Sequence, residues 1–190
     1  MEYALILIGA VLVNNIVLNQ FLGICPFLGV SSRLSTAVGM GAAVIFVMTM
    51  ATIAVWLIQD LVLVPLNIAF LQTVTFILVI ASLVQLVEIV LKKVSPPLYQ
   101  ALGVYLPLIT TNCAILGVAI LVVAREFNLA QSVVFAVGSS SGFLLALYIF
   151  AGIRERLELV NIPKAMRGAP IALITASLLA LAFGGFAGMV

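Results

Sequence analysis

Two cysteines are the chain's only candidates for thiolate chemistry, and it contains no histidine. Without histidine, Ser-His-Asp and Cys-His catalysis and histidine-ligated haem or zinc are excluded within this chain. The cysteines stand in similar surroundings: Cys-Pro-Phe-Leu-Gly-Val at 25–30 aligns with Cys-Ala-Ile-Leu-Gly-Val at 113–118, with four identities in six. This match predicts that Cys25 and Cys113 occupy equivalent places in an internal repeat.

The residues beside each cysteine predict the start of a helix. Proline favours the first position of a helix, and threonine and asparagine are common N-cap residues. Residues of these types flank the two cysteines: Pro26, Thr110, Thr111 and Asn112. Free N–H groups and the positive end of the helix dipole at such a start favour an anion, such as a thiolate or a negatively charged cluster.

The pattern alone leaves three fates open for these sulfurs. They are inert packing in an apolar interior, a disulfide between Cys25 and Cys113, and metal ligation. A [2Fe–2S] cluster takes four thiolates, so two cysteines are not enough for one. The missing pair would have to come from a second copy or from a homologous partner.

The composition indicates an all-α integral membrane protein. Hydrophobic residues make up 65% of the 190 residues and charged residues only 7%, whereas soluble domains carry about 25% charged residues. Each apolar stretch exceeds the roughly 18–20 residues that cross a hydrocarbon core of about 30 Å. The six predicted transmembrane spans are 4–30, 36–58, 68–91, 99–124, 130–152 and 169–190.

The basic residues predict the orientation of these spans. Seven of the eight fall in the loops after the first, third and fifth spans, and only Arg125 lies on the other side. The seven are Arg33, Lys92, Lys93, Arg154, Arg156, Lys164 and Arg167. By the positive-inside rule those three loops are cytoplasmic, which puts both termini on the periplasmic side.

The cysteine match further predicts one membrane domain made of two inverted halves, 1–93 and 98–190. Each half has three spans, and because three is odd the second half enters the membrane from the opposite side. The first and fourth spans also carry helix-breaking and polar residues, among them Asn14, Asn19, Gly23, Gly103 and Pro107. Irregular backbone at membrane depth is tolerated only where protein or a cavity surrounds it. We therefore predict that both helices are broken and that the breaks meet; two ordinary kinked helices are the alternative.

Other polar residues in the spans are weaker candidates. Asn15, Gln85 and Glu88 are candidates for an ion path. Glu88 also lies four residues before Lys92, a spacing that favours a helical salt bridge instead. The Gly138–Gly142 run and the Gly39–Gly41 pair are predicted to permit close helix contacts.

Three segments resemble a known family. NNIVLNQFLGICPFLGVS at 14–31, LYQALGVYLPLITTNCAILGVAIL at 98–121 and AGIRERLELVNIPKAMRGAPIALITA at 151–176 are similar to the A subunits of the bacterial Rnf ion-translocating oxidoreductase complex. The resemblance runs nearly the whole chain, and the E subunit of the sodium-pumping NADH:quinone oxidoreductase looks like a close cousin.

This resemblance implies a function that the residues alone do not establish. It implies that Cys25 and Cys113 supply two ligands of one intramembrane [2Fe–2S] cluster, and that a homologous membrane protein of opposite topology, the E subunit in Rnf, supplies the other two. It further implies a multi-pass subunit of the inner membrane in a complex with other Rnf subunits. That complex moves electrons between ferredoxin and NAD and couples this to Na⁺ or H⁺ translocation. No complete active site and no nucleic-acid partner are expected in this chain.

Two other functions remain open at the level of sequence. One is a secondary transporter that binds a small solute at the broken helices, with incidental cysteines. The other is a structural scaffold for redox partners, in which Cys25→Ser would leave activity intact.

Overall fold

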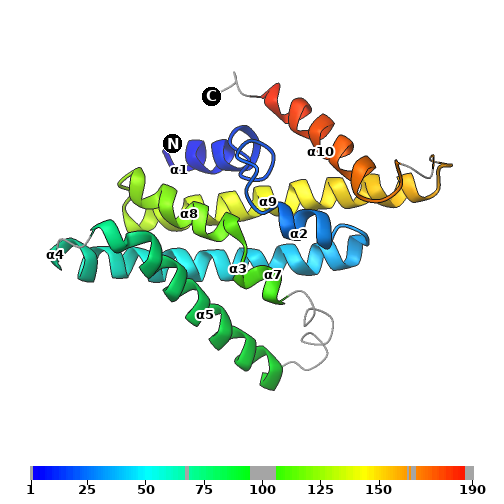
Figure 1. The fold of residues 1–190 in the computed structure, drawn as a ribbon. Helices are drawn as coiled ribbons and strands as arrows, with labels where there is room; N and C mark the ends of the chain where they lie inside the picture. Colours follow the sequence, from blue (N-terminus) through cyan, green and yellow to red (C-terminus); the bar gives the residue numbers. More distant parts are fainter. Residues whose placement is uncertain (1, 67–68, 95–105, 162, 164–165, 187–190) are drawn as a thin grey trace.

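The computed structural model describes residues 2–66, 69–94, 106–161, 163 and 166–186. All regular structure in these ranges is helical, which confirms the all-α prediction (Figure 1). The elements are α1 (Glu2–Ile8), the π-helical turn η1 (Gly9–Val13), α2 (Ile24–Gly29), α3 (Leu34–Ile58), the π-helical turn η2 (Gln59–Leu63), α4 (Val64–Leu66), the 3₁₀ turn η3 (Ala69–Leu71), α5 (Gln72–Val94), α7 (Leu106–Thr110), α8 (Cys113–Ala124), α9 (Leu129–Glu158) and α10 (Ala169–Gly184).

Four helical segments among the described residues are long and apolar enough to cross a membrane. They are Leu34–Leu63, Gln72–Val90, Pro107–Ala124 and Leu129–Glu158. The first and sixth predicted spans are represented by shorter apolar helices, Tyr3–Val13 and Ala169–Gly184. The first is short because its helix ends at Val13 and the chain then turns irregularly before α2 begins.

Two long helices, α3 and α9, lie side by side and form the centre of the molecule (Figure 1). On α3 the fully buried residues recur three or four positions apart, which is one face of a helix. These residues are Met40, Val44, Met48, Ala51 and Val55. With 30 residues, α9 is about 45 Å long at 1.5 Å per residue, longer than a hydrocarbon core.

Small residues allow backbones to approach α9 closely. A Cβ built on Gly142 would lie 3.0 Å from the Val11 carbonyl oxygen, and one on Gly138 would lie 3.1 Å from Ala10 Cβ. The Leu144 side chain likewise fills the place of a Cβ at Gly41. The predicted close contacts are therefore confirmed at these glycines. The prediction is wrong for Gly39, since a Cβ there would meet nothing within 4 Å.

Elements of the two halves run in opposite directions. In Figure 1, α1 and α2 together cross the molecule one way and α7 and α8 the other, and α3 likewise opposes α9. This is the arrangement that an inverted repeat requires. The exact division into 1–93 and 98–190 stays a prediction, and residues 99–105 of the fourth span lie outside the described ranges.

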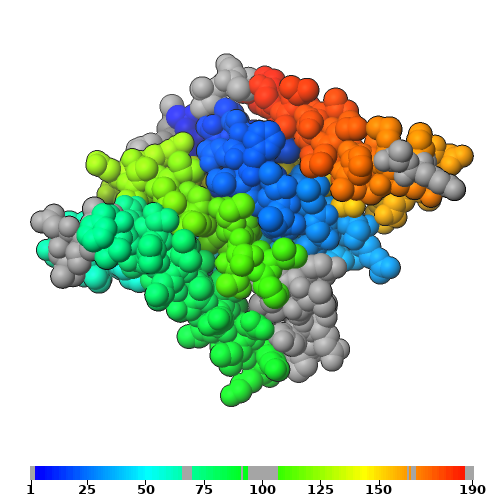
Figure 2. Space-filling view, viewed as in Figure 1, coloured from blue at the N-terminus to red at the C-terminus, as the bar shows by residue number. Residues whose placement is uncertain are grey.

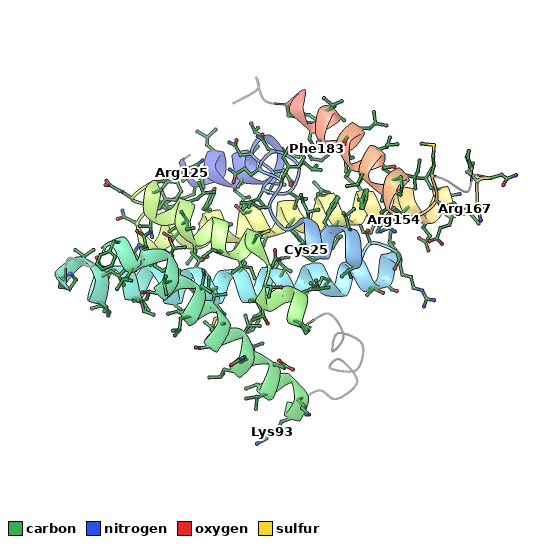
Figure 3. The ribbon with its side chains drawn as sticks, in the orientation of Figure 1. Cys25, Lys93, Arg125, Arg154, Arg167 and Phe183 are labelled. Atoms are coloured by element: carbon green, nitrogen blue, oxygen red, sulfur yellow. The ribbon has the colours of Figure 1, made fainter. Side chains whose placement is uncertain are left out.

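The predicted charge separation has a spatial counterpart. Figure 3 shows Arg125 near one end of the helix bundle, and Arg154 and Arg167 near the opposite end. Lys93, counted with Arg154, lies apart from both ends at the tip of α5, so the picture separates Arg125 from Arg154 and Arg167 but does not gather all the basic residues of one side.

Two helices continue beyond the predicted spans. After the predicted end of the second span at residue 58, a π-helical turn leads directly into α4. The segment from Arg154 to Glu158, predicted as a cytoplasmic loop or an interfacial helix, forms the last turns of α9. Charged residues end an apolar span but do not end a helix, because the helical hydrogen bonds continue beyond the hydrocarbon.

Candidate functional site

The first helix is broken between Val13 and Ile24, and the buried side chain of Asn15 organises the break. Its Nδ2 donates to the carbonyl oxygens of Gly142 at 2.8 Å and Val11 at 3.2 Å. Its Oδ1 accepts from the backbone N–H groups of Val17 at 3.1 Å and Leu18 at 3.4 Å. A buried asparagine amide thus replaces helical hydrogen bonds that this segment lacks and ties it to α9.

The short helix α2 that follows is held in place by α9. The rings of Phe27 and Phe150 stack with centroids 4.3 Å apart and an interplanar angle of 16°. The Arg154 guanidinium donates to the Leu28 carbonyl oxygen at 2.8 Å and to Ser31 Oγ at 2.6 Å. Because six residues form too few helical hydrogen bonds to be stable alone, these contacts position α2.

The fourth helix is broken at Thr111–Asn112, between α7 and α8. Asn112 is the N-cap of α8: its backbone is extended, and its Oδ1 accepts from the Ala114 N–H at 3.0 Å. Thr111 Oγ1 donates to the Pro107 carbonyl oxygen at 2.9 Å and closes the end of α7. Cys113 is the first residue of α8, as the N-cap residue types before it predicted.

The two breaks contact each other directly. The backbone N–H of Gly23, the N-cap of α2, donates to Cys113 Sγ at 2.9 Å. Figure 2 shows the same neighbourhood from outside, with the segment around α2 adjoining α7 and α8 on the visible face. Both predictions, that the first and fourth helices are discontinuous and that their breaks meet, are confirmed.

The junction is too tight for a side chain at position 23. A Cβ on Gly23 would lie 2.9 Å from Phe143 Cε2 and 3.1 Å from both Ala114 Cβ and Asn112 Oδ1. The Gly23 φ of 78° is in the left-handed region that glycine adopts without strain. Leu22 in turn fills the place of a Cβ at Gly117 on α8.

Both cysteines lie at this junction as exposed, free thiols. The disulfide alternative is therefore not what the structure contains. Cys25 is the second residue of α2, and Figure 3 shows it between the Arg125 end and the Arg154 end of the molecule. Pro26 is buried and is the third residue of α2, not the first as predicted, because Gly23 begins the helix earlier.

The repeated residues have matched environments. Cys25 and Cys113 are both exposed, Val30 and Val118 are both fully buried, and Leu28 and Leu116 are both partly buried against the core. Equivalent burial at aligned positions is what an internal repeat predicts.

The candidates for an ion path are not brought together. Asn15 lies in the first break with both ends of its amide hydrogen-bonded. Gln85 is exposed and Glu88 partly buried in the second half of α5, which extends toward Lys93 away from α2 (Figure 3). The structure therefore gives the three residues no common site.

Two residues of the site have roles that the sequence did not predict. The sequence marks Gly23 only as a helix breaker, although it caps α2 and donates to the other half's sulfur. It marks Arg154 only as a loop charge, although this residue holds the C-terminal end of α2 from 126 residues away in the chain. A positively charged residue near helix carbonyls is a common C-terminal contact, but nothing local in the sequence pairs Arg154 with Leu28.

Replacing Arg154 with methionine is expected to loosen α2 while keeping much of the buried aliphatic volume. Two hydrogen bonds from a charged donor are lost, and a loss of about 1.5–3 kcal/mol of stability is expected. Thermal unfolding of the purified protein measures this. Arg156→Met, at an exposed position in the same turns of α9, is the matched control and should change the unfolding midpoint little. Equal effects of the two variants would show that Arg154 does not hold α2.

Comparison with known proteins identifies the family. Residues 3–190 match the family described as Rnf-Nqr subunit, membrane protein. The chain is 62% identical over 186 residues to the A subunit of the ion-translocating oxidoreductase complex of Syntrophotalea carbinolica, and the match covers 98% of this chain and 96% of that protein. It is 58% identical over 189 residues to the A subunit of the Na(+)-translocating ferredoxin:NAD(+) oxidoreductase complex of Acetobacterium woodii, covering 100% of this chain and 98% of that one. With similar coverage, it is 55% identical to the A subunit of the ion-translocating oxidoreductase complex of Edwardsiella ictaluri. The chain therefore belongs to the Rnf-Nqr family of membrane subunits.

Proposed function

We propose that this chain is the A subunit of an ion-translocating ferredoxin:NAD oxidoreductase complex. In this proposal Cys25 and Cys113 provide two of the four thiolates of a [2Fe–2S] cluster within the membrane. A homologous membrane subunit of opposite topology provides the other two. The names of the relatives support the complex, and the geometry of the two breaks supports the cofactor.

The residues at the junction fit such a group. Two free thiols open to the outside of the chain, and each belongs to the first turn of a helix, where backbone N–H groups have no helical partners. Within the described ranges no group of three or more histidine, cysteine, aspartate or glutamate residues is placed to hold a metal. The donor set is therefore two sulfurs at a surface, which suits a site completed by a second subunit.

The observation that carries the proposal is the hydrogen bond from the Gly23 N–H to Cys113 Sγ. It joins the start of one half's helix to the sulfur of the other half, 90 residues apart. It also places a donor on the sulfur, which stabilises negative charge there. Bound at these sulfurs, the cluster supplies one-electron chemistry inside the membrane.

Reduction at this site would add negative charge in a low-dielectric region, where uncompensated charge is costly. That cost is a physical reason for cation uptake, or a conformational change, to accompany reduction. The proposal therefore links electron flow to Na⁺ or H⁺ translocation through charge compensation at the cysteine junction. It further places the Arg154 end of the molecule in the cytoplasm and both termini in the periplasm, in an inner membrane.

The alternative of a solute transporter finds little support at the breaks. The cavity beside the first break, between η1, Asn15, Asn19 and the end of α10, has a volume of only about 40 Å³. A pocket of this size has room for a few ordered waters.

Electron paramagnetic resonance on the complex tests the proposal. The reduced complex should show an iron–sulfur signal that disappears, together with the corresponding iron, in Cys25→Ser and in Cys113→Ser. Ser82→Ala is the control, because the Ser82 hydroxyl is exposed and donates within α5, to the Leu78 carbonyl oxygen at 2.8 Å. If both cysteine variants retain every signal and all the iron, the cluster is not held here.

A further inference from the structure

The side chain of Asn112 combines deep burial with an unused hydrogen-bond donor. Asn112 is only 3% exposed, and no acceptor in the described part of the chain lies within hydrogen-bond reach of its Nδ2. Its Oδ1 accepts from the Ala114 N–H, and this bond settles which amide atom is oxygen and which is nitrogen. The group left without a partner is therefore an N–H donor.

The comparison with Asn15 shows that this is not a general property of the breaks. Asn15 is the buried asparagine of the first break, and its Nδ2 has two carbonyl acceptors. Asn112 occupies the second break, yet only its oxygen is used. Serine, threonine or aspartate would also cap α8 and would leave no buried amide N–H unpaired. Capping α8 thus explains the oxygen of Asn112 but not its nitrogen.

The position of this amide points to the acceptor that it serves. Asn112 directly precedes Cys113, and its Oδ1 lies 3.1 Å from where a Cβ on Gly23 would be. The N–H of the same Gly23 donates to Cys113 Sγ. The amide is therefore packed into the contact between the two breaks, where sulfur is the acceptor already in use.

We infer that Asn112 Nδ2 donates a hydrogen bond to a sulfur of the iron–sulfur group held by Cys25 and Cys113, and so raises its reduction potential. The inference rests on the proposed function. An N–H donor stabilises added negative charge on sulfur more than it stabilises the oxidised state. The bond changes no stoichiometry: one electron is gained on reduction, and Asn112 keeps both amide protons. Asn112 is thus a positioning and tuning residue, not a ligand.

The test is a potentiometric titration of the complex, followed by electron paramagnetic resonance. The signal of this site is the one that Cys25→Ser removes. Asn112→Gly takes away the donor without adding charge, and glycine is a tolerable N-cap. We expect a tenfold smaller equilibrium constant for reduction. For a one-electron step this corresponds to a reduction potential about 59 mV lower.

The matched control is Asn128→Gly, which alters the asparagine N-cap of α9 outside the cysteine junction. It should leave the potential unchanged. An unchanged potential in an Asn112→Gly complex that keeps its iron overturns the inference, because the acceptor is then not a sulfur of this group.

A second measurement decides the case in which Asn112→Gly loses its iron. In wild-type complex carrying ¹⁵N in its asparagine side-chain amides, pulsed electron paramagnetic resonance should detect a coupling between the electron spin of the reduced site and a ¹⁵N nucleus. Its absence overturns the inference even though the site is intact. A wild-type complex with no signal that depends on Cys25 instead contradicts the proposed function itself, so the two failures are distinguishable.

Discussion

Replacing Cys113 with serine is expected to abolish both electron transfer through the complex and the ion uptake coupled to it. Cys113 Sγ is the sulfur at which the two broken helices meet. A serine hydroxyl is a poor ligand for iron, so the replacement should remove the site and leave the fold of α8 nearly unchanged. Reconstituted vesicles measure both activities: oxidation of reduced ferredoxin with NAD as acceptor, and uptake of ²²Na⁺ or acidification of the interior.

The coupling is tested by comparing the two losses. If charge compensation at the cysteine junction drives translocation, ion uptake falls by the same factor as electron transfer, at least tenfold for each. Ser82→Ala, at an exposed position of α5, should retain both. Ion uptake at the full rate in Cys113→Ser, or electron transfer at the full rate, contradicts the account of the site.

The local features of the site were predictable from sequence. Asn112 before Cys113 is an N-cap residue type before an apolar run, and the cap forms as predicted. The breaks were predictable because polar and helix-breaking residues in an apolar span need protein around them. The sequence therefore predicts well the features, such as caps and helix breaks, that depend on neighbouring residues.

The features that were missed depend on contacts between distant segments. The role of Gly23 arises from Phe143, Ala114 and Asn112, all of which belong to the second half. The link between Arg154 and Leu28 exists because α9 runs past α2. A single sequence contains no signal for such pairings. The predicted spans also end earlier than the helices, because charged residues mark the edge of the hydrocarbon and not the end of a helix.

The exposed apolar surface of α5 is a further point that only the structure makes visible. Residues such as Val74, Leu78 and Leu86 are more than half exposed in the isolated chain. In a membrane such a surface faces lipid or a neighbouring protein, so its exposure does not conflict with a stable fold. The polar Gln85 on the same helix is more costly in lipid than against a protein partner.

Replacing Gly23 with alanine should disrupt the junction between the two broken helices. Left-handed backbone costs a residue with a Cβ about 1–2 kcal/mol. The new methyl would also press on Ala114 Cβ, Asn112 Oδ1 and the Phe143 ring, and overpacking costs about 1–3 kcal/mol. We expect a clear fall in the thermal unfolding midpoint and loss of the iron–sulfur signal, because α2 can no longer begin beside Cys113.

Gly39→Ala is the matched control, since Gly39 lies inside α3 with nothing within 4 Å of the new methyl group. Alanine favours the helix there by about 0.5–1 kcal/mol, so the control should be as stable as the wild type or slightly more stable.

The decisive quantity is the iron content of the folded Gly23→Ala protein. The N–H of residue 23 survives the replacement, so an alanine protein that stays folded and keeps its iron would mean that α2 tolerates the shift. In that case the close contact of the two breaks is not what forms the site. Loss of iron at a temperature where the protein remains folded would instead show that the spacing between the Gly23 N–H and Cys113 Sγ governs metal binding directly.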